Sequence, residues 1–308
     1  MAYFMNTHAH HHTHDHHGHH HAPHGNAFVI GILLNSAFVI AEIIYGITAN
    51  SLALLADAGH NAGDVLGLCM AWGATLLAKR RASERFTYGL QSASILAALA
   101  NSLILMVAIG GVAWEAIQRL NSPEAPAAYT VMAVAAIGAV VNGLTAWLFH
   151  GGHHDLNIRS AFVHMVADAA ISLGVVISGA LILKTGWLWL DPAMSLAIIV
   201  VIMFGTWQLL KQSVSLALHA VPASVDAAKV KAFLGGLKGV REVHDLHIWG
   251  MSTTDIALSA HLIMPEGHPG DAFIHEITHE LEDFFHIGHA TLQIEVGDLD
   301  SACHSGCI

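Results

Sequence analysis

The sequence predicts a membrane protein of six transmembrane helices followed by a small α+β domain. Of its 308 residues, 54% are hydrophobic and only 11% are charged, whereas soluble domains usually carry about 25% charged residues. Six apolar stretches are each long enough to cross a hydrocarbon core of about 30 Å as a helix. The character then changes, because residues 222–308 hold thirteen acidic residues against four basic ones. We therefore expect a membrane domain over residues 27–221 and a soluble domain over residues 222–308.

Residues 1–26 form a polar tail with eleven histidines between His8 and His24. Such a low-complexity stretch cannot bury a core, so we expect it to be disordered unless metal binds it. It lacks a basic start followed by an apolar core, so we expect no cleavable signal peptide. Interruptions such as Asp15 and Pro23 favour a loose metal-collecting arm over a cloned tag, because clustered imidazoles raise the chance of capture.

The distribution of basic residues sets the expected orientation in the membrane. Four of them lie in the loop of residues 79–89, and Arg159 and Lys211 lie on the same side. The opposite side carries only Arg119 and Lys184. The positive-inside rule therefore places both termini and the 79–89 loop in the cytoplasm. The expected spans are residues 27–49, 52–78, 90–117, 127–149, 160–183 and 189–214.

The soluble region is expected to contain a helix, two strands, a second helix and a third strand. The third strand is the clearest, because residues from Ala290 to Val296 alternate between apolar and polar, as a half-buried strand requires. This order predicts a compact layer of helices on a sheet. The expected elements are a helix at 225–237, strands at 242–249 and 255–264, a helix at 271–285 and a strand at 290–296.

Two identical H-x-x-x-D motifs stand in the second and the fifth expected span. They are His60 with Asp64, and His164 with Asp168. A spacing of four residues puts each histidine and its aspartate on one helix face, one turn apart. Two such pairs facing each other would supply two imidazole nitrogens and two carboxylate oxygens. That tetrahedral set suits Zn²⁺ better than the larger, oxygen-preferring Ca²⁺.

The position of these motifs in the membrane strengthens the metal interpretation. An ionisable group at mid-membrane costs about 2.5–3.5 kcal/mol on insertion scales, so four of them need compensation, which a bound dication provides. The alternative is four separately satisfied residues that join helices. Repetition of the motif in corresponding spans of two three-helix halves favours the metal site. Other polar residues could orient a ligand or form interhelical hydrogen bonds. These are Asn35, Glu42, Asp57 and Asn142.

Two further groups of histidine or cysteine could bind metal. Three histidines within residues 150–154 would lie near the cytoplasmic mouth. The segment Cys-His-x-x-Cys at residues 303–307 offers soft ligands for Zn²⁺ or Cu⁺, or is simply a frayed terminus. With Cys69 as the remaining cysteine, the chain suggests no disulfide framework.

Several segments together resemble the cation diffusion facilitator family, most closely its zinc-efflux branch. Besides the paired H-x-x-x-D motifs they are LLADAGHNAGD (54–64), FTYGLQSASILAALANS (86–102), LDPAMSL (190–196) and VHDLHIWGMSTTDIALSAHL (243–262). The match covers about residues 27–300 in order. It implies a homodimer of six-span protomers that carry a cytoplasmic ferredoxin-like domain and exchange metal for protons. It also implies which residues are the transport ligands of a zinc carrier. These are His60, Asp64, His164 and Asp168.

The chain departs from its relatives at two places. Ser92 and Ser94 stand where many relatives carry a basic and an acidic residue, so an ion pair there is absent. Some members bind a second metal in the loop after the second span. Here residues 79–89 contain no histidine and only Glu84 as a carboxylate, so we expect no metal site in this loop.

A cytoplasmic metal site is a second expectation from the resemblance. His244, His261 and His275 match positions that bind metal in some members, and Glu295 stands where a fourth ligand could be. Exposed histidines on an acidic domain are also often merely solvated, so both interpretations remain open. Residues 222–308 carry a net charge of -9 (four basic minus thirteen acidic). Two such domains in a dimer should repel each other, and bound metal would lower that repulsion.

These expectations combine into Zn²⁺/H⁺ antiport, with efflux across a bacterial inner membrane expected from the resemblance. Metal binding needs deprotonated ligands, so protons compete with Zn²⁺ for the site. An intramembrane metalloprotease is disfavoured, because H-E-x-x-H is absent and four protein ligands would close the site. A passive channel requires weaker binding. Cd²⁺ or Co²⁺ would use the same ligand set. The formal charge of -11 argues against nucleic acid as a partner.

Overall fold

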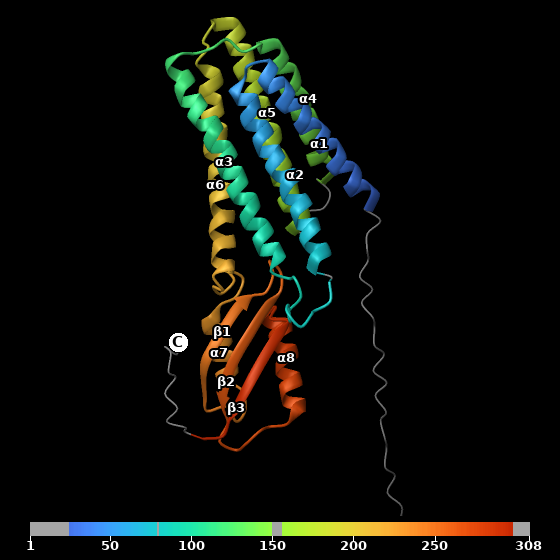
Figure 1. Cartoon of the computed structure of the whole chain (residues 1–308), viewed down its shortest axis with the longest axis vertical. Helices are drawn as coiled ribbons and strands as arrows, with labels where there is room; N and C mark the ends of the chain where they lie inside the picture. The colour runs from blue at the N-terminus through green and yellow to red at the C-terminus, as the bar shows by residue number, and fades with distance from the viewer. Residues whose placement is uncertain (1–24, 79, 150–155, 298–308) are drawn as a thin grey trace, which may run out of the picture.

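The computed structural model describes residues 25–78, 80–149 and 156–297. These residues form a bundle of six helices with an α+β domain at one end (Figure 1). The ends of the six helices differ from the predicted spans by at most four residues. The helices are α1 (Gly25–Thr48), α2 (Leu52–Ala78), α3 (Ala93–Asn121), α4 (Ala128–Phe149), α5 (Leu156–Thr185) and α6 (Leu190–Ala217).

Four helical segments of the described chain are long and apolar enough to cross a membrane. They are Ala93–Asn121, Ala128–Trp147, Phe162–Thr185 and Leu190–Ala217. A shorter apolar segment, Asn35–Thr48, belongs to α1. Helix α2 is not among the four, because its buried polar and ionisable residues lower its mean hydropathy. Helix α2 carries the first of the two H-x-x-x-D motifs.

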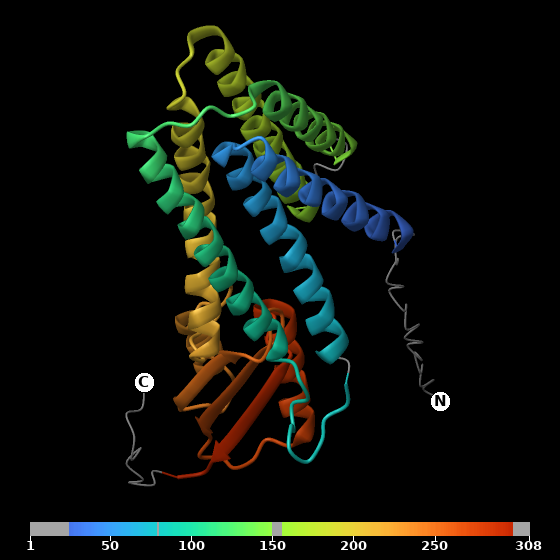
Figure 2. The same ribbon diagram turned by 45° about the horizontal axis from the view of Figure 1, so that its top comes forward.

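The outer surface of the bundle consists of large apolar side chains. Val107, Trp147 and Phe204 are 77%, 72% and 76% exposed. In water such a surface would be a large apolar patch, whereas against lipid tails it is the expected surface. The interior is closed by smaller residues and by branched aliphatic ones, such as Ala53 and Ile198. Figure 2 shows α3 and α6 running side by side along one edge of the bundle.

A buried aspartate fixes the start of α2 to the start of α6. Asp191 in the first turn of α6 accepts a hydrogen bond from Ser51 Oγ at 2.5 Å and another from the backbone N–H of Leu52 at 2.7 Å. A carboxylate at a helix N-terminus satisfies unpaired N–H groups and complements the helix dipole. The segment LDPAMSL therefore contributes to the position of the helix that holds the first H-x-x-x-D motif.

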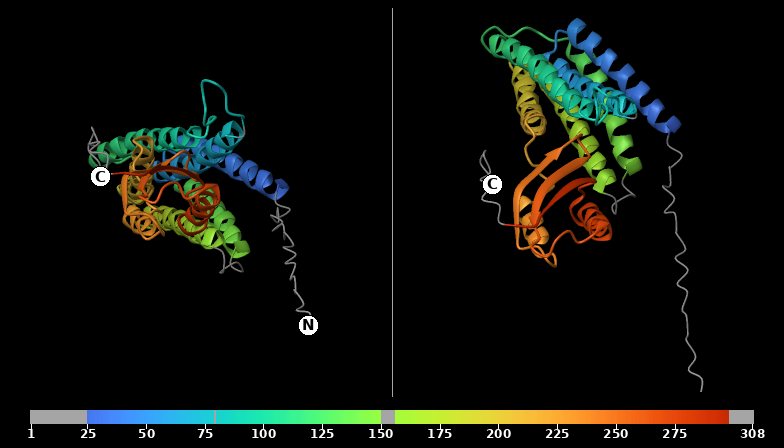
Figure 3. Two further views of the ribbon diagram at one scale, coloured as in Figure 1. Left: turned by 90° about the horizontal axis from the view of Figure 1, so that it is seen from below. Right: turned by 60° about the horizontal axis from the view of Figure 1, so that its bottom comes forward.

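The C-terminal domain has the predicted order of helix, two strands, helix and strand. Strand β2 is central; it pairs antiparallel with β1 and parallel with β3. Leu234 of the first helix and Leu281 of the second pack with Leu258 and Leu262 of β2 in one core. Figure 3 shows this domain lying beneath the bundle. The elements are α7 (Ala227–Gly235), β1 (Glu242–Gly250), β2 (Ile256–Ile263), α8 (Asp271–Phe285) and β3 (His289–Glu295).

The two serines that replace an expected ion pair join the two parts of the molecule. Ser92 Oγ donates a hydrogen bond to the carbonyl of Met251 at 3.1 Å. The N–H of Thr253 donates to Ser94 Oγ, also at 3.1 Å. The Met251 carbonyl and the Thr253 N–H both lie in the turn between β1 and β2. Neutral hydrogen bonds therefore hold this turn against the start of α3.

Candidate metal centre

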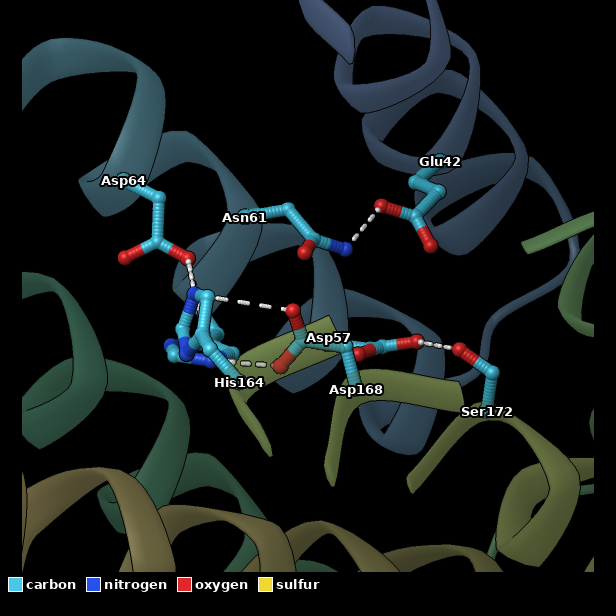
Figure 4. Close-up of polar contacts among 8 residues, drawn as sticks. Glu42, Asp57, Asn61, Asp64, His164, Asp168 and Ser172 are labelled. Atoms are coloured by element: carbon cyan, nitrogen blue, oxygen red, sulfur yellow. Dashed lines mark hydrogen bonds and ion pairs between the residues drawn. The ribbon is translucent and has the colours of Figure 1, made fainter. Parts of the chain in front are cut away.

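The two H-x-x-x-D motifs meet between α2 and α5 (Figure 4). The Nε2 atom of His60 lies 3.2 Å from Oδ1 of Asp168, and Nε2 of His164 lies 3.0 Å from Oδ2 of Asp64. Within each helix the histidine is farther from its own aspartate, at 3.8 Å and 3.6 Å. Each imidazole thus lies between two carboxylates, one from each helix. The four candidate ligand atoms all lie within 4.8 Å of one another.

The group has a closed side and an open side. The side chains of Asp168 and His60 are 2% and 16% exposed, whereas those of Asp64 and His164 are 33% and 42% exposed. A cation can therefore reach the group from the side of Asp64 and His164. The other two side chains are held in the low-dielectric interior, where an opposite charge interacts most strongly with them.

Close helix contact beside the group depends on a glycine. A Cβ atom added at Gly63 would lie 2.9 Å from the side chain of Leu105 on α3. Such a distance would force the Leu105 side chain to shift. Gly63 lies one residue before Asp64, so the glycine lets α3 pack directly against the stretch that carries the first motif.

Two fully buried carboxyl groups lie near the group but do not hydrogen-bond its four residues. Glu42 Oε2 accepts from Asn61 Nδ2 at 2.9 Å, which joins α1 to α2. Asp57 Oδ2 accepts from Ser172 Oγ at 3.1 Å, which joins α2 to α5. The sequence left open whether these carboxyls orient a ligand or join helices; their hydrogen bonds are interhelical. Of the other polar residues noted, Asn35 is half-buried on α1 and Asn142 is buried on α4.

A second group of possible metal ligands lies on the sheet of the C-terminal domain. His244 Nε2 lies 3.0 Å from Glu295 Oε2, and His261 Nδ1 lies 3.0 Å from Glu295 Oε1. Asp245 Oδ2 is 3.5 Å from His261 Nε2. Burial acts to raise the pKa of Glu295, but hydrogen bonds from His244 and Gln293 outweigh it and hold that pKa below its usual value.

The structure brings together two of the three cytoplasmic histidines named from the sequence. His275 lies on α8, with its ring centroid 5.0 Å from that of His279, and is not part of the group on the sheet. Glu295 is the third member of the group on the sheet and contacts both His244 and His261. Metal binding by His275 stays a prediction. The histidines up to residue 24, those of residues 150–154 and the cysteines of 303–307 lie outside the described residues.

Asp245 is a neighbour of this group that sequence reasoning did not find. Strand alternation would turn Asp245 to the face opposite His244. The pairing of β1 with β2 is irregular between His244 and His247, and Asp245 has a φ of 50°. A bulge of this kind redirects a side chain. No signal in the sequence marks the bulge, because β1 otherwise reads as a regular strand.

A helix bundle with an apolar outer surface and ionisable histidines and aspartates in its interior is a membrane protein with a cation site. Residues 28–216 match the family model of the cation efflux transmembrane domain, and residues 222–296 match that of the cation efflux protein, cytoplasmic domain. The chain therefore belongs to the cation efflux family, the cation diffusion facilitators. It is an integral, multi-pass membrane transporter rather than an enzyme, and its α+β domain is the cytoplasmic domain of that family.

Several curated relatives match nearly the whole chain. It is 33% identical over 290 residues to the zinc transporter ZitB of Escherichia coli, covering 93% of this chain and 92% of that protein. It is 32% identical over 275 residues to a cadmium, cobalt and zinc/H(+)-K(+) antiporter of Bacillus subtilis, with 87% and 88% covered. It is 34% identical over 285 residues to the metal cation efflux system protein CzcD of Cupriavidus metallidurans, with 91% and 90% covered. The resemblance seen in the sequence is confirmed.

Proposed function

We propose that this chain exports Zn²⁺ from the cytoplasm in exchange for protons. The transport ligands are His60 and Asp64 of α2 and His164 and Asp168 of α5. One observation carries the proposal: two nitrogens and two oxygens from two helices lie within 4.8 Å of one another. This arrangement needs little change to bind a tetrahedral ion.

The choice of Zn²⁺ rests on the chemistry of the four donors. Two imidazoles with two carboxylates suit a tetrahedral, borderline-soft ion, whereas Ca²⁺ takes six to eight oxygens. The relatives support this choice, since they include a zinc transporter and an antiporter for cadmium, cobalt and zinc. Cd²⁺ and Co²⁺ accept the same donors. A Cd²⁺ or Co²⁺ carrier of the same mechanism is therefore the second candidate.

Exchange for protons follows from the use of the same atoms by both ions. Nε2 of His60 and Nε2 of His164 face carboxylate oxygens, so a proton on either nitrogen is shared with an aspartate. A metal must displace those protons before it can use the nitrogens. Protons arriving from the far side would release the metal in turn, since the pKa of free imidazole is about 6.5. One relative is also named as a proton antiporter.

The proposed arrangement in the membrane has six spans with both termini in the cytoplasm of a bacterial cell. Helices α1 and α2 have 24 and 27 residues. At about 1.5 Å per residue they are about 36 Å and about 40 Å long, enough to cross a core of about 30 Å. Residues 27–221 form the transport domain and residues 1–26 a metal-collecting tail. Residues 222–308 form a ferredoxin-like domain through which two copies dimerise.

A cavity on the domain side of α2 and α3 offers a path for cytosolic metal. Its volume is about 550 Å³, and its lining includes Gly67, Asn101 and Asp255. Gly67 lies three residues, about one turn, beyond Asp64 on α2. The cavity thus extends from the turn between β1 and β2 toward the transport group. A hydrated dication would meet amide, hydroxyl and carboxylate oxygens along this path.

The group on the sheet is proposed to sense metal. His244, His261 and Glu295 bind Zn²⁺ and thereby lower the repulsion between two acidic cytoplasmic domains. The dimer with Zn²⁺ bound to its cytoplasmic domains would populate a transport-ready state more than the metal-free dimer does. The close contacts of Glu295 with both histidines support this role.

The test is Zn²⁺ uptake into liposomes that contain the full-length protein and a fluorescent zinc dye. With an imposed pH gradient, the wild type should show saturable uptake that depends on the gradient. The double variant Asp64→Ala/Asp168→Ala should show none. Glu115→Gln is the matched control, since Glu115 forms a partly exposed ion pair with Arg119 away from the site. Uptake by the double variant at the wild-type rate would refute the transport site.

A further inference from the structure

Glu42 on α1 and Asp57 on α2 are two buried acids that the exchange mechanism above does not use. Both side chains are 0% exposed. Each has one oxygen tied to a neighbouring helix, by Asn61 and Ser172 respectively. The other oxygen of each, Oε1 of Glu42 and Oδ1 of Asp57, is buried with no hydrogen-bond partner among the described residues. Figure 4 shows the two carboxyls on the far side of Asn61 and Asp168 from the half-buried Asp64.

Burial away from water disfavours ionisation of both acids at once when the metal site is empty. Both side chains are fully buried, and Figure 4 shows their carboxyls in the same part of the bundle interior. No lysine or arginine pairs with either one in the described part of the chain. The titratable groups that act on them are His60 and Asp168. Like charges in a water-free interior repel strongly, so one carboxyl keeps a proton. That proton also gives an otherwise unpartnered oxygen a hydrogen bond.

We propose that Glu42 and Asp57 form a proton site separate from the metal ligands, and that its proton takes part in the exchange. This inference rests on the proposed antiport. When a dication occupies the group of four ligands, its charge favours the doubly ionised pair, and one proton leaves toward the cytoplasm. When the dication leaves on the far side, the pair takes up one proton. Charge and protons balance, because each cycle returns the pair to its starting state.

The contacts of the pair explain how it would respond to the state of the metal site. Asn61, which donates to Glu42, directly follows His60 in α2. Ser172, which donates to Asp57, lies four residues after Asp168 in α5. A movement of α2 against α5 would therefore change the surroundings of both acids. The pair links three helices, so it can couple its proton to the alternation of the carrier.

The experiment counts the protons released per Zn²⁺ bound by the full-length protein in detergent. Titration calorimetry in buffers of different ionisation enthalpy gives this number. Glu42→Gln keeps an oxygen that can accept from Asn61, and Asp57→Asn keeps one for Ser172. Each variant should release about one proton fewer than the wild type while still binding Zn²⁺. Glu115→Gln, a carboxyl variant outside the pair, should release the wild-type number.

The outcomes separate this inference from the proposed function. An unchanged proton count in Glu42→Gln and Asp57→Asn would overturn the pair and leave the antiport standing. Unchanged Zn²⁺ binding in Asp64→Ala/Asp168→Ala would overturn the transport site itself.

Infrared spectra of the wild type provide a readout that needs no variant. The metal-free protein should show the C=O band of a buried protonated carboxyl, which Zn²⁺ removes; absence of that band would also overturn the pair.

Discussion

The two groups of histidines and carboxylates in this molecule offer the same kinds of ligand atom, but one lies in the bundle interior and the other near the surface of the sheet. The group in the bundle draws on two helices and includes Asp168, which is 2% exposed. The group on the sheet draws on three strands, and His244, His261 and Glu295 are 23%, 27% and 14% exposed. An empty site costs little near water, whereas buried charges in lipid must always be neutralised. We therefore expect the bundle group to be always occupied, by protons or by metal, and the sheet group to fill only when metal is plentiful.

Removal of a ligand from the bundle group should have the largest effect. Asp168→Ala takes away the most buried carboxylate and the partner of His60. Loss of an outer-shell partner alone costs about 10–100-fold in metal affinity, so loss of a ligand should reduce transport by at least about 100-fold. Initial rates of Zn²⁺ uptake in liposomes measure this. Transport above a tenth of the wild-type rate would show that the two groups are not as different as their burial indicates.

Removal of the sheet group should reduce transport by only about two- to five-fold, because it shifts a population rather than removing the path. The variant is His244→Ala/His261→Ala, measured for uptake at low and at high Zn²⁺. His275→Ala is the matched control, since His275 is not part of the group. A loss as complete as that of Asp168→Ala would show that the two groups do not differ in their importance for transport. A reduced uptake in His275→Ala would show that His275 is a metal ligand after all.

In both groups the sequence predicted features within one helix or strand, but not those that depend on how elements pack or pair. The i, i+4 spacing predicted that His60 and Asp64 share one face of a helix, and apolar length predicted the helix itself. The cross-helix contact between His60 and Asp168 depends on how α2 packs against α5, which spacing within one helix does not encode. On the sheet, alternation predicted the third strand well. The bulge that turns Asp245 toward His261 depends on strand pairing and left no trace in the residues.

The acidic member of the sheet group predicts a pH effect on the stability of the cytoplasmic domain. Burial acts to raise the pKa of Glu295, and the hydrogen bonds from His244 and Gln293 lower it further than burial raises it. A carboxyl whose pKa is lowered on folding stabilises the domain above its unfolded pKa of about 4.3. That contribution is lost as the pH falls through the lower, folded value. Glu295→Gln should therefore destabilise the domain at neutral pH and converge with the wild type in acid.

Hydrogen exchange of the β2 and β3 amides in the full-length protein measures this stability. His244→Ala/Glu295→Gln provides the control, since loss of both partners should cost less than the sum of the single losses. A difference between Glu295→Gln and the wild type that persists at low pH would mean that the carboxylate charge is not the cause.

The smallest effect is expected at the junction of the two regions, where it tests whether the two groups communicate. Ser94→Ala removes the acceptor of the Thr253 N–H, while Ser92 keeps its bond to Met251. Loss of one such hydrogen bond costs about 0.5–1.5 kcal/mol. Basal uptake should change little, because the bond lies outside both groups. If the sheet group acts on the bundle through this turn, Zn²⁺ should stimulate Ser94→Ala about two-fold less than the wild type. Equal stimulation would mean that the influence of the sheet group travels through another contact, and that the neutral bonds of Ser92 and Ser94 only hold the domain in place.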